Sequence, residues 1–178
     1  IMVQQKWAMS AIEKLYQHHY GKPFVARKLD AQVALYGFCG YRNKVRDKFN
    51  GAPLLFINGD KDEMVQAAPC DDFAGWMNER GGNAKSVTLK GHYHTFDART
   101  AAVYDSRVSH MGYCNLLADE RGITDVKTGT FTPGDYNAVL QEAVGKCYTA
   151  RGVTTGNTNG DWKVAVPLWL EFFKQHLQ

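Results

Sequence analysis

An acidic and a basic side chain follow two successive apolar segments of this sequence, and together they could activate a nucleophile. Asp62 comes after the apolar residues 54–57, and His94 comes after residues 85–89. Histidine titrates near neutral pH, so it can take a proton from a hydroxyl or a thiol. A carboxylate on the other ring nitrogen fixes the tautomer and stabilises the imidazolium that forms. We therefore predict that Asp62 and His94 are the acid and the base of a catalytic triad.

Each of these residues has a neighbour of the same type two positions earlier. Asp60 would be the acid if the preceding strand ended sooner, although the spacing Gly59-x-x-Asp62 favours Asp62. His92 is the alternative base. His92 and His94 could also bind a metal together, because alternate residues of an extended segment point the same way. No Cys or Glu lies at a supporting spacing, so we expect neither a metal nor another cofactor.

The periodicity of apolar residues predicts which elements carry these side chains. Short apolar runs indicate buried strands, and apolar residues three or four positions apart indicate helices. We expect strands at 32–38, 54–57 and 85–89, helices at 1–19, 70–80, 136–146 and 162–176, and a loop at 152–160. Strands interleaved with helices predict an α/β fold in which a parallel sheet is flanked by helices. The carboxyl ends of such strands share one edge, where Asp62 and His94 should meet.

Size and charge narrow the classes of function. The 178 residues fit one domain, and 44% of them are hydrophobic, which is enough for a core. A net charge of +3 is too small to indicate a nucleic-acid partner. No apolar run reaches the roughly 18 residues of a membrane-spanning helix, so we expect no membrane span.

The four cysteines lack the C-x-x-C spacing of a zinc or redox site. Cys39 and Cys70 both follow predicted strands at the same sheet edge, so a bridge between them is geometrically reasonable. Cys114 and Cys147 would then form a second bridge. If both disulfides form, the protein is extracytoplasmic, either periplasmic or secreted. Four buried free thiols are the alternative.

Two segments resemble the dienelactone hydrolase family of the α/β-hydrolases. Residues 53–70 look like that family's acid-bearing strand and loop, with Gly59-x-x-Asp62 and then a Pro-Cys pair that opens a helix. Residues 91–96 resemble the family's Gly-x-x-His-x-Phe loop, which selects His94 over His92 as the base. Residues 1–97 match well, whereas residues 98–160 match poorly and form a long excursion or a lid-like segment. The resemblance implies a hydrolase that cleaves a small carboxylic ester or lactone.

The nucleophile is missing from this pattern. The elbow G-x-S-x-G joins a strand to a helix, and none of the candidates Ser10, Ser106, Ser109 and Cys114 has that setting. The opening helix resembles the helix that follows the elbow, so we expect the nucleophile just before Ile1. The chain would then be the C-terminal half of an α/β-hydrolase, inactive without its N-terminal half as a partner. That half would also cover the unpaired edge of the first strand. The alternative is a non-catalytic α/β-hydrolase-like subunit for binding or assembly.

Overall fold

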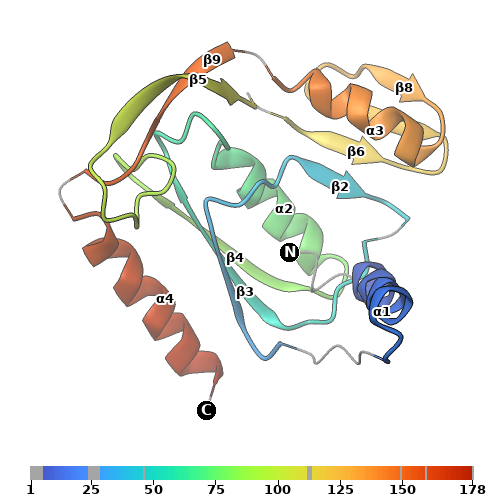
Figure 1. Cartoon of the computed structure of the whole chain (residues 1–178), viewed down its shortest axis with the longest axis horizontal. Helices are drawn as coiled ribbons and strands as arrows, with labels where there is room; N and C mark the ends of the chain where they lie inside the picture. Colours follow the sequence, from blue (N-terminus) through green and yellow to red (C-terminus); the bar gives the residue numbers. More distant parts are fainter. Residues whose placement is uncertain are drawn as a thin grey trace.

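The structure is a computed structural model that describes residues 6–23, 29–45, 47–111, 114–148, 150–158 and 160–177 (Figure 1). The first five residues of the predicted opening helix, residues 1–5, lie outside the described residues.

Three parallel strands form the sheet that carries the predicted acid and base. The strands β1 (Gln32–Leu35), β3 (Pro53–Gly59) and β4 (Asn83–Leu89) lie in the order β1-β3-β4. All three strands were predicted, although the first ends at Leu35 and not at residue 38. The reason is local, because Tyr36 takes a φ of 40°, which an extended strand does not allow.

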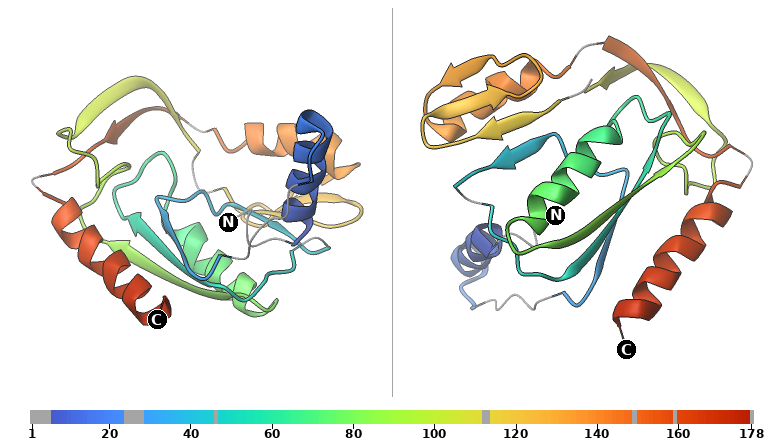
Figure 2. Two further views of the ribbon diagram at one scale, coloured as in Figure 1. Left: turned by 60° about the horizontal axis from the view of Figure 1, so that its bottom comes forward. Right: turned by 180° about the vertical axis from the view of Figure 1, so that it is seen from behind.

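Helices cover both faces of this sheet, as predicted (Figures 1 and 2). Side chains alternate along β3, so Leu54 and Phe56 pack toward α2 (Ala68–Asn78) while Ile57 packs toward α4 (Trp162–His176). The helix α2 begins two residues earlier than predicted, because its proline lies in the first turn, where no backbone N–H is needed. The chain therefore has mixed α/β content with a parallel sheet between helices.

Residues 98–160 leave the sheet and return to it. The strand β5 (Val103–His110) leads outward, and β9 (Ala150–Thr155) returns antiparallel to it, so the two form a ribbon that ends near α4 (Figure 1). The predicted loop at 152–160 is therefore wrong for residues 152–155. Thr and Gly in this segment indicated a turn, but Val153 and Thr154 pair with β5, and this pairing overrides the local preference.

Between the two strands of the ribbon the chain forms most of a small module, and one strand from earlier in the chain joins its sheet. Its sheet has the order β2-β6-β7-β8, made of β2 (Tyr41–Asn43), β6 (Leu116–Ala118), β7 (Gly122–Asp125) and β8 (Phe131–Pro133). The predicted helix at 136–146 is present as α3 (Tyr136–Gly145) and covers this sheet. None of the four strands was predicted, because runs of three or four residues are too short to show a period.

Both predicted disulfides are present. Cys39 is bonded to Cys70 at the start of α2, with a Cα–Cα distance of 4.9 Å. Cys114 is bonded to Cys147, with a Cα–Cα distance of 5.2 Å, and this bond joins the beginning of the module to its end. Two disulfides are compatible with an oxidising compartment.

The helix α1 (Lys6–Tyr20) is the first element of the chain (Figure 1). Two of its large apolar side chains are exposed, Leu15 at 67% and Tyr20 at 60%. None of the helices in the described ranges has the length and the apolar character of a membrane span.

Candidate active site

The carboxylate of Asp62 is held by the loop that follows β3. Its side chain is fully buried. The oxygen Oδ1 accepts hydrogen bonds from the backbone N–H groups of Met64 and Val65, at 2.9 and 2.8 Å. Two amide donors at one oxygen fix the side-chain rotamer, and they leave Oδ2 to point toward the next strand end.

Oδ2 of Asp62 meets the ring of His94. The distance from Oδ2 to Nδ1 of His94 is 2.8 Å, a hydrogen-bond distance, and the His94 side chain is 14% exposed. An ionised carboxylate only accepts hydrogen bonds, so the shared proton lies on Nδ1. In the neutral ring Nε2 then carries a lone pair, and no described residue holds a hydrogen bond to it. The structure therefore brings the two predicted residues together in the arrangement that a general base requires.

The loop that carries the predicted acid Asp62, named here the acid loop, touches the loop that carries the predicted base His94, named here the base loop. The contact is made through their backbones. The N–H of Lys61 donates to the carbonyl oxygen of His92 at 3.0 Å. A Cβ atom on Gly59 would lie 2.1 Å from that same oxygen, which is much closer than real contacts allow. The glycine of the Gly59-x-x-Asp62 motif therefore has a steric reason, because only glycine lets the two loops approach this closely.

The alternative residues Asp60 and His92 have different partners. Oδ1 of Asp60 accepts the backbone N–H of Gly91 at 2.5 Å, which ties the acid loop to the base loop. Nδ1 of His92 lies 2.8 Å from the carbonyl oxygen of Lys90. The two histidine rings thus have separate partners, and the described residues contain no group of three His, Cys, Asp or Glu side chains that could hold a metal ion.

Two further residues shape the surroundings of His94, and the sequence analysis did not assign them. The ring of Tyr36 lies against the His94 ring, with 4.6 Å between their centroids. Burial, together with the nearby carboxylate of Asp97 that accepts its hydrogen bond, raises the pKa of the Tyr36 phenol. Tyr36 directly follows β1, so it lies at the same sheet edge as Asp62. This position in the sequence could have identified Tyr36 as a residue near the site.

The end of β9 and the residue that follows it contact the backbone of His94. The backbone N–H of Gly156 donates to the carbonyl oxygen of His94 at 2.7 Å, and His94 pairs with Thr155 in an isolated parallel bridge. A segment about 60 residues downstream therefore fixes the backbone of His94. No sequence period indicated this contact.

No hydroxyl or thiol in a strand-to-helix elbow occurs in the part of the chain that the structure describes. Ser10 lies within α1, and Ser106 and Ser109 lie within β5. Cys114, the remaining candidate from the sequence, is oxidised in a disulfide. The structure thus brings Asp62 and His94 together, and the described residues place no such nucleophile beside them.

Comparison with protein-family models, with curated proteins and with solved structures gives no match for this chain.

Proposed function

We propose that this chain supplies the acid and the base of a hydrolase that cleaves a small carboxylic ester or lactone. The observation that carries the proposal is the 2.8 Å contact between Nδ1 of His94 and Oδ2 of Asp62, whose other oxygen is held by two backbone amides. The resemblance of residues 53–70 and 91–96 to the dienelactone hydrolase family supports the same reaction and an α/β-hydrolase fold.

In this mechanism His94 acts twice. Its Nε2 first takes the proton of a serine or cysteine nucleophile as that atom attacks the carbonyl carbon, and Asp62 stabilises the imidazolium. The imidazolium then protonates the departing alkoxide, and an acyl-enzyme remains. His94 next takes a proton from water as that water attacks the acyl carbon, and it returns the proton to the departing serine or cysteine as the acid is released.

The nucleophile would come from an N-terminal half of the same hydrolase, outside this chain. Two features of the described residues support such a partner. The strand β1 is hydrogen-bonded only to β3, so its other edge is open to a further parallel strand. Two large apolar side chains of α1, Leu15 and Tyr20, are exposed, and the same partner would cover them. The two disulfides support a periplasmic or secreted protein.

The test is turnover of a chromogenic short-chain ester by the chain combined with the segment that precedes Ile1. His94→Ala should lower kcat/KM by roughly 10³-fold or more, because the general base is removed. His176→Ala is the matched control, because this histidine is the last residue of α4 and its ring packs on Phe172. Unchanged turnover in His94→Ala would refute the assignment. A complex that binds the ester without cleaving it would favour the non-catalytic subunit.

A further inference from the structure

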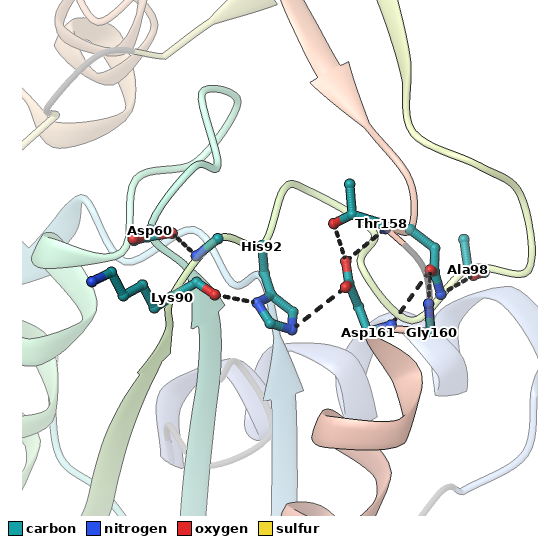
Figure 3. Close-up of polar contacts among 9 residues, drawn as sticks. Asp60, Lys90, His92, Ala98, Thr158, Gly160 and Asp161 are labelled. Carbon is teal, nitrogen blue, oxygen red and sulfur yellow. Dashed lines mark hydrogen bonds and ion pairs between the residues drawn. The ribbon is translucent and has the colours of Figure 1, made fainter.

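A second histidine–carboxylate contact lies between the loop that carries His92 and the start of α4 (Figure 3). Nε2 of His92 is 3.8 Å from Oδ1 of Asp161, and the two side chains are 12% and 8% exposed. Nδ1 of His92 faces the carbonyl oxygen of Lys90, so this nitrogen carries a proton. Nε2 is buried and has no hydrogen bond to a described residue, and the carboxylate is the anion that faces it.

The carboxylate of Asp161 is itself held in place. Its Oδ2 accepts hydrogen bonds from both the backbone N–H and the hydroxyl of Thr158, each at 2.8 Å. Asn157 supports the same turn, because its Oδ1 accepts the N–H of Gly160 and its Nδ2 donates to the carbonyl oxygen of Ala98 (Figure 3). Asp161 precedes α4 but makes no capping hydrogen bond to it, so its charge is directed at His92.

A row of aromatic rings connects His92 with His94. The ring of His92 packs edge-on against Phe96 at 5.8 Å, and Phe96 packs edge-on against Tyr36 at 5.6 Å. Tyr36 in turn lies against His94 at 4.6 Å. Phe96 is completely buried, so it cannot move without displacing its neighbours. The rings of Phe96 and Tyr36 thus form a continuous packed path between His92 and His94.

We propose that His92 and Asp161 are positioning residues that hold the base loop so that Nδ1 of His94 stays within reach of Asp62. The pair acts through the electrostatic contact between the His92 ring and the Asp161 carboxylate, in a place where water screens it little. This role rests on the proposed function, because His94 needs to be positioned only if it is the base.

The first measurement uses this chain alone and does not depend on catalysis. Solvent exchange of the His94 Nδ1 proton, followed by NMR of ¹⁵N-labelled histidine, reports how often the base loop opens. Asp161→Asn keeps an oxygen for Thr158 but removes the charge, so we expect exchange to become roughly tenfold faster. Asp119→Asn is the matched control, because Asp119 also accepts a backbone N–H within a turn, that of Arg121, but lies in the small module. Its exchange should equal that of the wild type.

A second variant covers the case in which Asp161→Asn fails to fold. His92→Phe keeps a ring against Phe96 and removes both nitrogens, and it should also accelerate exchange. Asp161→Glu retains the charge and should restore slow exchange. If Asp161→Asn and His92→Phe both exchange at the rate of the control, the positioning role is refuted.

Turnover separates this inference from the proposed function. In the chain combined with the segment that precedes Ile1, Asp161→Asn should lower kcat roughly tenfold and leave KM unchanged, since only the placement of the base is affected. Loss of activity in His94→Ala with a normal kcat in Asp161→Asn would overturn the positioning role alone. Full activity in His94→Ala would overturn the proposed function, and faster exchange in Asp161→Asn would then show that the pair holds the base loop without a role in catalysis.

Discussion

Replacement of Asp62 separates the two tasks of its carboxylate. One oxygen accepts two backbone N–H groups of its own loop, and the other accepts the proton of His94. Asp62→Ala removes both acceptors, whereas Asp62→Asn keeps a carbonyl oxygen for the loop and loses the charge opposite His94. The two variants should therefore differ in stability although both disrupt the contact with His94.

The magnitudes follow from these contacts. Loss of a side-chain acceptor for backbone amides costs about 1 kcal/mol. A hydrogen bond to a charged group contributes about 1.5–3 kcal/mol. Asp62→Ala should thus lower the free energy of unfolding by roughly 2–4 kcal/mol, because it loses both. Asp62→Asn keeps the loop contacts and should cost about 1 kcal/mol, since a neutral amide facing the ring replaces only part of the charged bond.

Equilibrium unfolding in urea measures this difference, with disulfides intact. For a chain of this size 1 kcal/mol corresponds to roughly 2–4 °C in Tm, so thermal unfolding gives a second reading. Equal losses in Asp62→Ala and Asp62→Asn would show that the loop amides do not depend on this oxygen. If the free energy of unfolding fell by less than about 0.5 kcal/mol in both Asp62 variants, they would resemble ordinary surface substitutions. That result would refute the described contacts of Asp62.

Two further predictions concern the base loop and its neighbours. Gly59→Ala should lower the free energy of unfolding by roughly 1–3 kcal/mol, because its Cβ would collide with the carbonyl oxygen of His92. Gly75→Ala is the control, because a Cβ at this position of α2 meets nothing within 4 Å, and it should stabilise the fold slightly. Urea unfolding of the two variants measures the difference. Burial and Asp97 raise the pKa of Tyr36, so the folded state retains this proton at a pH where the unfolded chain has lost it. Stability should be complete below the ordinary tyrosine pKa and fall as the pH rises through the raised value. Asp97→Asn should lower the pKa of Tyr36 toward its ordinary value and lessen this alkaline loss, and NMR titration of the tyrosine ring carbons should show no such change for Asp119→Asn.

Much of the central fold could be predicted because its signals are local. The apolar segments of β3 and β4 are long enough to show as buried strands, and strands interleaved with helices form a parallel sheet. This order alone places the residues after each strand at a common edge. The helix α4 occurs at the predicted residues for the same reason, because it has a strong apolar period.

The segment 98–160 could not be predicted to the same extent. The strands of the small module contain three or four residues each, which is too short for an apolar period. They gain stability from neighbouring strands and from the disulfide between Cys114 and Cys147. The strand β9 has a composition that indicates a turn, yet its backbone groups pair with β5. Pairing between distant residues leaves no period in the sequence.

That an aspartate and a histidine follow successive buried strands can be predicted from the sequence, because side-chain chemistry and strand order are properties of the chain. Which neighbouring residues come into contact depends on how the loops pack in the folded protein. In the folded protein Asp62 contacts His94, Asp60 accepts the N–H of Gly91, and Asp161 faces His92. The physical reason is that a hydrogen bond needs two groups within about 3 Å, and that distance depends on how loops far apart in the chain pack together.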